Sequence, residues 1–134
     1  MAEDYTPDES EPYMGARQLA YFRDLLLAWK ASIANASSAT LQSLKDVSLR
    51  EADQGDRASN ETNRNIELRT RDRQRKLTAK IDAALRRIDA GEYGYCDVTG
   101  DPIGIGRLMA RPVATMTVEA QEAHERREKV SRDD

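Results

Sequence analysis

The segment 95–121 has the spacing of a small metal-binding module. Cys96 is followed three residues later by Thr99, and Thr117, eighteen residues further on, is followed three residues later by Ala120. A zinc ribbon carries a cysteine at all four places, because a structural zinc ion needs about four nitrogen or sulfur ligands in a tetrahedral arrangement. This chain has a single cysteine, and its only histidine lies outside the segment. We therefore expect these four positions to form a degenerate metal site that holds no zinc.

Cys96 itself allows two interpretations. A lone cysteine is most often a small buried hydrophobic residue. The alternative is a redox sensor, which needs a thiol of low pKa and usually a second, resolving cysteine, and the chain has no second thiol. A structural zinc ion contributes about 10 kcal/mol or more to the folding of a small domain, so its loss must be compensated. We expect Thr99, Thr117 and Ala120 to close the site by packing and hydrogen bonds.

No catalytic set accompanies these residues. The sequence has neither a Ser/His/Asp grouping at a recognisable spacing nor a glycine loop of the phosphate-binding type. The segment 100–106 (GDPIGIG) is rich in glycine but does not fit the dinucleotide-binding pattern, and Pro102 favours a turn. We expect a protein that is not an enzyme.

A second candidate site is a basic stretch. Residues 64–87 include nine basic and three acidic residues, although the formal net charge of the whole chain is −3. Pairs one helical turn apart, such as Asp72 with Lys76, belong to an ordinary solvent-exposed helix face. The remaining positive charge predicts a partner that carries carboxylates or phosphates. Nucleic acid is one alternative, but no aromatic stacking residues or reading motif accompany the charges.

The composition bounds the class of protein. Of the 134 residues, 34% are charged and 5% are aromatic, which favours long solvent-exposed helices over a large core. No apolar run approaches the ~20 residues of a membrane span, and the N-terminal residues lack the basic-then-apolar order of a signal peptide. A single cysteine excludes an intrachain disulfide and fits a reducing compartment. We expect a cytoplasmic protein.

Two long helices are expected to position both sites. From about Gly15, apolar residues recur at spacings of three and four, the pattern of a coiled-coil seam. This seam comprises Leu19, Phe22, Leu26, Trp29, Ile33 and Ala36, followed more weakly by Thr40, Leu44 and Val47. The segment 37–40 (SSAT) has low helix propensity and is a candidate break between two helices.

The second long helix is expected to start near Asp56 and to end near Ala90, with Gly91 as its stop. Its seam comprises Thr62, Ile66, Arg73, Leu77, Ile81, Ala84 and Ile88. Only residues 53–56 separate the two helices, too few for a crossover, so the helices should be antiparallel neighbours.

These elements predict a mainly α protein with five segments. The segments are a flexible acidic N-terminal tail (1–12), an N-terminal helix that packs with the globular part (13–32), a long antiparallel coiled-coil hairpin (33–90) with its tip at 50–58, a small zinc-finger-like globular domain without metal (91–117) and a C-terminal helix (118–134). The globular domain should consist of short turns with room for two small strands. Thr117 is the expected N-cap of the last helix.

Several stretches of this sequence resemble the DksA/TraR family of bacterial transcription factors. They are EPYMGARQLAYFRDLLLAWK at the start of the first helix, DQGDRAS at the tip, ELRTRDRQRKLTAKIDAALRRIDAGEYGYC in the second helix, and GIGRLMARPVAT in the globular part. The resemblance extends from Glu11 to the end of the chain. Better-known members carry zinc cysteines at the places of Cys96, Thr99, Thr117 and Ala120, so this chain resembles a zinc-lacking subset.

The resemblance implies a regulator of transcription initiation that binds RNA polymerase and does not read DNA. The hairpin would enter the secondary channel of the polymerase, and the protein would act with the alarmone ppGpp. The implied outcome is repression of ribosomal RNA-type promoters and support for some amino-acid biosynthesis promoters. We expect a monomer that needs no zinc and does not bind membranes.

The resemblance also assigns roles at the tip. Asp53 and Asp56 align with the paired tip aspartates of the family, and Ala58 aligns with the alanine that follows them. Without the resemblance, Asp56 would be an ordinary N-cap and Asp53 a turn residue. We expect these three residues to form the effector tip.

Five further residues belong to the site that the resemblance implies for polymerase or ppGpp, and three of them match the family. Arg73, Lys80 and Arg111 match residues that contact the polymerase rim or the alarmone. Leu77 lies in the same patch, although its seam position supports a role in the core equally well. Gln121 stands where the family often has a lysine, and the loss of that cation should weaken an alarmone site.

Two other functions stay open. A transcript-cleavage or elongation factor would enter the same channel, and its tip carboxylates would hold a second catalytic magnesium ion. A coiled-coil adaptor would use the polar hairpin to join other proteins. An adaptor should tolerate neutralised tip aspartates, whereas both polymerase functions should not.

Overall fold

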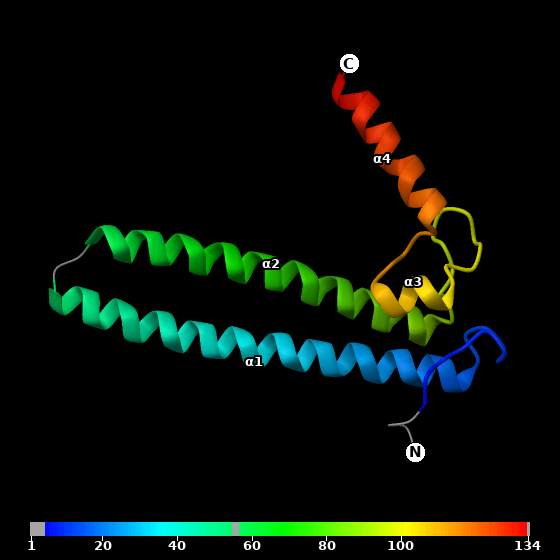
Figure 1. Cartoon of the computed structure of the whole chain (residues 1–134), viewed down its shortest axis with the longest axis horizontal. Coiled ribbons are helices and arrows are strands. Elements are labelled where there is room, and N and C mark those ends of the chain that lie inside the picture. The colour runs from blue at the N-terminus through cyan, green and yellow to red at the C-terminus, as the bar shows by residue number, and fades with distance from the viewer. Residues whose placement is uncertain (1–4, 55–56, 134) are drawn as a thin grey trace. The chain divides into compact units, whose positions relative to one another are not determined.

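The computed structural model of the chain describes residues 5–54 and 57–133, without the side chains of residues 44, 47–48, 50–54, 57–60 and 132–133. The helices in the described part are α1 (Ala16–Gln54), α2 (Arg57–Ala90), α3 (Ile105–Ala110) and α4 (Val118–Asp133) (Figure 1). One isolated antiparallel bridge joins Tyr95 to Pro102. The predicted mainly α fold is therefore confirmed.

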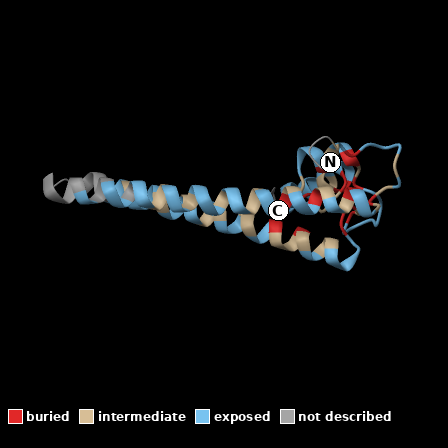
Figure 2. Ribbon diagram, turned by 90° about the horizontal axis from the view of Figure 1, so that it is seen from below, coloured by how far each residue is buried: buried red, intermediate tan, exposed pale blue. Residues whose placement is uncertain are grey.

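The chain divides into two compact units. Leu27–Asp82 forms a hairpin unit, and Met1–Leu26 together with Ala83–Asp134 forms a globular unit. Buried residues gather in the globular unit, whereas the hairpin unit carries mainly exposed and half-buried residues (Figure 2). No helix in the described part is long and apolar enough to cross a membrane.

The hairpin unit contains the two long helices side by side and antiparallel, as predicted. The Lys30 ammonium lies 2.7 Å from the Asp82 carboxylate, and the Ser37 hydroxyl donates a hydrogen bond of 2.6 Å to the Gln74 side-chain oxygen. Within each pair, the two residues lie at nearly equal distances along the chain from residues 55–56, as expected for two helices joined there. The candidate break at 37–40 does not occur, because α1 runs through it without interruption.

The seam of the hairpin differs from the predicted one near the tip. Ala36, Thr62, Ile66 and Arg73 were predicted seam positions, and all four are exposed. On α2 the less exposed residues are instead Asn63, Glu67, Thr70 and Gln74, followed by Leu77, Ile81, Ala84 and Ile88. This set follows an unbroken alternation of four and three residues, the heptad rhythm. The prediction followed the apolar residue Ile66, whereas the helix geometry places polar residues in the seam.

The core of the globular unit is small and aromatic. Phe22, Leu26 and Leu108 are completely buried. The rings of Phe22 and Tyr93 lie 5.6 Å apart between centroids, and the Tyr93 hydroxyl donates a hydrogen bond of 2.7 Å to the Pro112 carbonyl. Burial raises the pKa of Tyr93 far above its ordinary value, so this hydroxyl stays protonated as a donor.

Residues 5–15 pack against the globular unit. Pro7 is buried, and the Gln18 amide, 1% exposed, donates to the Asp8 carbonyl and accepts from the Met14 N–H. The composition of residues 1–12 predicts a disordered or loosely docked tail, and residues 5–12 are docked in this structure. The segment docks because Gln18 of α1 binds its backbone and the Arg17 guanidinium lies 3.9 Å from the centre of the Tyr5 ring, so its acidic composition does not prevent docking.

Two glycines shape the turn that follows α2. Gly91 has a φ of 75° and lies where the Glu92 and Tyr93 N–H groups return to the Arg87 carbonyl, a C-terminal stop as predicted. Gly94 has a φ of 93°, and a Cβ atom there would lie 2.6 Å from the Met14 side chain. The turn therefore requires glycine at both positions.

The short helix α3 was not predicted. Ile105 and Leu108 are buried on the same side of it, three residues apart, which is a helical spacing. The neighbouring glycines favoured turns and two small strands, but the described residues contain only the Tyr95–Pro102 bridge. A helix of six residues leaves too short a pattern for the sequence to reveal.

Candidate functional site

The four degenerate metal positions still meet in the globular unit. Cys96 is 4% exposed, and its Sγ receives hydrogen bonds from the Thr99 hydroxyl and from the Thr99 and Thr117 N–H groups. Thr117 is also buried and caps α4, because its Oγ1 accepts a hydrogen bond of 3.1 Å from the Ala120 N–H. Hydrogen bonds thus connect all four positions.

The same hydrogen bonds set the acidity of the thiol. Burial by itself raises the pKa of Cys96, because a thiolate loses solvation. The donors from Thr99, Thr117 and Val98 favour the thiolate more strongly, and together they lower the pKa from 9.0 to about 7. The pKa of this thiol therefore lies close to neutral pH.

The residues at this place do not fit a structural zinc ion. Zinc sites use thiolate, imidazole or carboxylate ligands, and Cys96 is the one such ligand among the four positions. The Thr117 oxygen is already engaged by the helix that it caps. The described part of the chain also contains no group of three or more His, Cys, Asp or Glu residues that could hold a metal ion.

A stripe of positive charge runs along the hairpin unit. Arg73 and Lys80 are exposed, and Leu77 lies between them on the same side of α2 but is half-buried in the seam. Arg69 is also exposed and lies one turn before Arg73, so Arg69, Arg73 and Lys80 form a cationic stripe. The sequence analysis did not single out Arg69, although its spacing from Arg73 and Lys80 is helical.

The acidic residues of α2 do not neutralise this stripe. Glu67 pairs with Arg71 at 2.8 Å, and Asp82 pairs with Lys30 of α1 at 2.7 Å. Asp72 contacts Lys76 at 3.0 Å and Arg75 at 2.5 Å, and these hydrogen bonds lower the pKa of its carboxyl group. Within the described part of the chain, the members of the cationic stripe have no ion pair, so the stripe remains available for an anionic partner.

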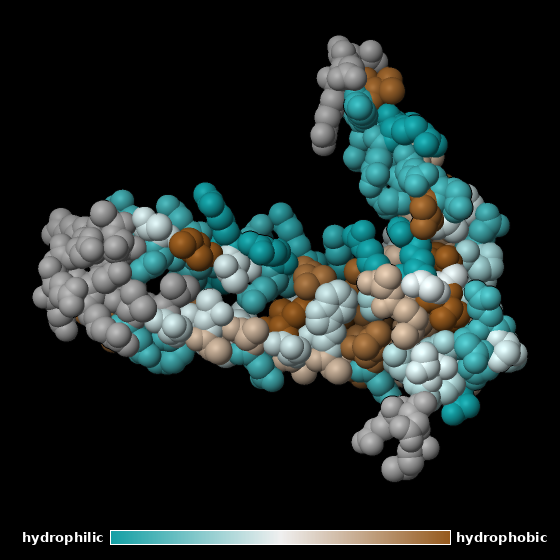
Figure 3. All heavy atoms as spheres, in the orientation of Figure 1, coloured by the Kyte–Doolittle hydropathy of each residue, from teal (hydrophilic) through white to brown (hydrophobic). Residues whose placement is uncertain are grey.

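Two other predicted site residues lie in the globular unit. Arg111 is exposed directly after α3, where its N–H closes the helix on the Arg107 carbonyl. Gln121 is half-exposed in the first turn of α4, and its amide donates a hydrogen bond of 3.1 Å to Glu125. In the view of Figure 3, most of the described side chains that can be seen on α4 are hydrophilic. Among the residues that the structure describes, Arg111 thus has no ion pair and supplies a cation, whereas Gln121 carries no charge.

The predicted effector tip is outside this description. Asp56 lies outside the described residues, and the side chains of Asp53 and Ala58 are not described either. The backbones of Asp53 and Ala58 belong to the last turn of α1 and the first turn of α2. The role assigned to these three residues stays a prediction.

Comparison with known protein families identifies both parts of the chain. Residues 18–88 match the family model described as DnaK suppressor protein DksA, N-terminal domain. Residues 91–126 match the model described as prokaryotic dksA/traR C4-type zinc finger. The second match covers the degenerate metal site, so the likeness there extends over a finger whose four-cysteine ligand set this chain does not have.

Relatives match along nearly the whole chain. The RNA polymerase-binding transcription factor DksA of Caulobacter vibrioides is 61% identical over 98% of this chain and 92% of that protein. The protein of the same name from Escherichia coli K12 is 39% identical over 95% of this chain and 84% of that protein. The solved structure of transcription factor DksA2 from Pseudomonas aeruginosa is similar with a TM-score of 0.81 and 42% identity, over 92% of this chain and 94% of that one. The chain therefore belongs to the DksA family.

Proposed function

We propose that this protein regulates transcription initiation by binding RNA polymerase through its secondary channel, together with ppGpp and without zinc. It acts by binding and has no catalytic activity of its own. Its relatives bear the name RNA polymerase-binding transcription factor. The observation that carries the proposal is the cationic stripe, whose arginines and lysine have no ion pair in the described part of the chain.

The cationic stripe supplies what docking on a large anionic enzyme surface needs. Exposed cations without partners raise the rate of encounter with an acidic surface, and arginine binds carboxylates and phosphates through two parallel hydrogen bonds. Arg73 and Lys80 would contact the rim of the channel, and Arg111 would contribute to alarmone binding. Leu77 supports the stripe from the seam.

The proposed tip acts at the other end of the hairpin unit. Asp53 and Asp56 would bring carboxylates near the metal or the basic mobile elements of the polymerase active site and change the field there. Ala58 would keep the start of α2 small enough to enter. The hairpin would thus carry the tip carboxylates into the secondary channel, and the globular unit would remain outside the channel.

Alarmone coupling should be weaker than in a relative with a lysine at position 121. Gln121 carries no charge, and its amide already bonds to Glu125. Arg111 remains exposed to meet a phosphate. We therefore propose that ppGpp strengthens the action of this protein without being strictly required for it.

In vitro transcription tests the proposed function. Purified polymerase transcribes from a ribosomal RNA promoter with the protein, with and without ppGpp, in the presence of a chelator that binds zinc but leaves the magnesium that the polymerase needs. Inhibition that persists with chelator and increases with ppGpp is the expected result. No effect on initiation, combined with stimulated cleavage of RNA in backtracked complexes, would indicate a transcript-cleavage factor instead.

A further inference from the structure

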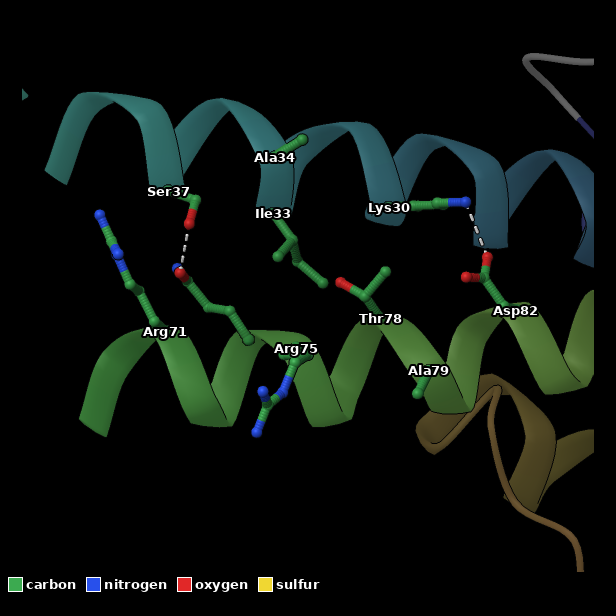
Figure 4. A pocket seen from close by; sticks show the side chains of 10 residues that line it. Lys30, Ile33, Ala34, Ser37, Arg71, Arg75, Thr78, Ala79 and Asp82 are labelled. Carbon is green, nitrogen blue, oxygen red and sulfur yellow. Dashed lines mark hydrogen bonds and ion pairs between the residues drawn. The ribbon is translucent and has the colours of Figure 1, made fainter. Parts of the chain in front are cut away.

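The hairpin unit contains a hollow on one side, between α1 and α2 (Figure 4). Its volume is about 440 Å³, and we refer to it as the hairpin hollow. Two polar bridges join the helices at its ends: the Lys30–Asp82 ion pair at 2.7 Å and the Ser37–Gln74 hydrogen bond at 2.6 Å. The two bridges mark the ends of the hollow along the seam, and its side is open to solvent.

Small and apolar side chains form the wall of the hairpin hollow. Ile33 and Thr78 point toward one another between the two bridges, and Ala34 and Ala79 line the space beside them (Figure 4). Ala34 and Ala79 point away from the facing helix in this view, and their methyl groups are too small to cover the space beside Ile33 and Thr78. An apolar side chain of a partner could fill this space and gain contacts that the wall now lacks.

Positive charge borders the same hollow. Arg71 and Arg75 line it, and their side chains are 50% and 78% exposed. Each makes one ion pair within α2, with Glu67 and Asp72 respectively. A guanidinium group has five N–H donors in a fixed plane, so both arginines keep donors for a carboxylate of a partner.

The hairpin hollow lies on a different face of α2 from the cationic stripe. Arg71, Arg75 and Thr78 recur at spacings of four and three and so share one side of the helix. Arg73 lies two residues from both arginines, and Lys80 lies two residues beyond Thr78. Two residues correspond to about 200° around an α-helix. The two basic surfaces therefore face nearly opposite directions.

We propose that the hairpin hollow is a second docking surface for RNA polymerase, which inserts an apolar side chain between Ile33 and Thr78 and places a neighbouring carboxylate against Arg71 and Arg75. This inference rests on the proposed function. A hairpin inside a channel has channel wall on both sides, and the cationic stripe accounts for only one of them. Charge complementarity identifies the occupant as an acidic segment of the polymerase.

Filling the hollow tests this proposal. Ala34→Leu should occupy the space and lower the affinity for purified polymerase about tenfold, measured by fluorescence anisotropy of the labelled full-length chain. The matched control is Ala28→Leu, the same change at an exposed position that lies on the opposite side of α1 from Lys30. The control should retain its affinity within twofold. Circular dichroism melting of both variants checks that the helices still form.

A charge variant tests the second part of the contact. Arg75→Gln should lower the affinity about fivefold, and the loss should shrink at high salt, where charge pairs are screened. If wild type and Ala28→Leu bind polymerase and Arg73→Glu weakens binding, but Ala34→Leu and Arg75→Gln bind as wild type does, the proposed function stands and the second docking surface is overturned. If the wild-type chain does not bind polymerase, the proposed function fails and this inference fails with it.

Discussion

At the scale of single residues, Cys96 shows how the former metal site is arranged without the other three zinc cysteines. The hydrogen bonds that lower the pKa of its thiol come from Thr99 and Thr117, which stand at two of the former metal positions, and from the N–H group of Val98. N–H and hydroxyl donors stabilise a thiolate by partial positive charge, which is part of what a zinc ion would do there. In the degenerate site, hydrogen-bond donors thus surround the one sulfur atom that remains.

The thiol of Cys96 should titrate near neutral pH. Because the chain has one cysteine, ultraviolet absorbance of the thiolate reports on this residue alone. We expect a midpoint near pH 7, in line with the lowered pKa. Thr99→Val removes the hydroxyl donor and should raise the midpoint. Thr62→Val, the same change at an exposed position in the hairpin unit, should not alter it.

This pKa also predicts how stability depends on pH. The folded state lowers the pKa of Cys96 from 9.0 to about 7, so the thiolate stabilises the fold fully above pH 9 and loses this effect as the pH falls through 7. The melting temperature of wild type relative to Cys96→Ala should therefore increase between pH 6 and pH 9. A difference that stays constant over this range would show that Cys96 contributes by packing alone.

Gly94 should be the least replaceable glycine of the turn. A Cβ atom there would lie 2.6 Å from Met14 Cγ, and its φ is 93°. Gly94→Ala should lower the free energy of unfolding by about 2 kcal/mol or more. Gly106→Ala is the matched control, because position 106 lies within α3 with open space around it and should gain up to ~1 kcal/mol. Thermal melting of the two variants measures both effects.

At the scale of elements, the position of an apolar residue relative to the seam of the hairpin unit determines how much it contributes to stability. Leu77 is half-buried in the seam, whereas Ile66 is 51% exposed. Leu77→Ala should lower the free energy of unfolding by about 2 kcal/mol, and Ile66→Ala should change it by no more than ~0.5 kcal/mol. Urea unfolding followed by circular dichroism tests the pair. If both variants lost the same free energy of unfolding, Ile66 would belong to the seam, as the sequence predicted.

The two long helices, their antiparallel pairing and the Thr117 cap could all be predicted from the sequence, because each depends on signals within a few residues or on the short connection at 53–56. The register near the tip could not, since hydrophobic spacing loses its meaning where the seam is polar and Ile66 points to solvent. The hairpin hollow could not either. It depends on which residues of the two helices lie beside one another, and a single sequence does not specify those pairs.

At the scale of the whole molecule, docking and regulation should be separable. In the proposed function, the cationic stripe binds polymerase, and the tip acts on the polymerase active site after binding. Arg73→Glu should therefore lower the affinity for polymerase about tenfold. The affinity of the wild-type chain should fall steeply as salt rises, because exposed charges more than about 10 Å apart are screened at 0.1 M salt. Affinity that is independent of salt would contradict electrostatic docking.

Asp56→Asn should keep the affinity for polymerase and lose the regulation of transcription. The change keeps the size of the side chain and an N-cap acceptor, so we expect unchanged folding and an affinity within twofold of wild type, but loss of inhibition at a ribosomal RNA promoter. Binding and in vitro transcription must be measured on the same preparation, with Asp46→Asn in α1 as the control for removal of one exposed carboxylate. If Asp56→Asn inhibits as wild type does, occupation of the channel by the hairpin is enough, and the tip carboxylate has no part in the effect. If Asp56→Asn fails to bind, the tip contributes to docking, and the two functions share one surface.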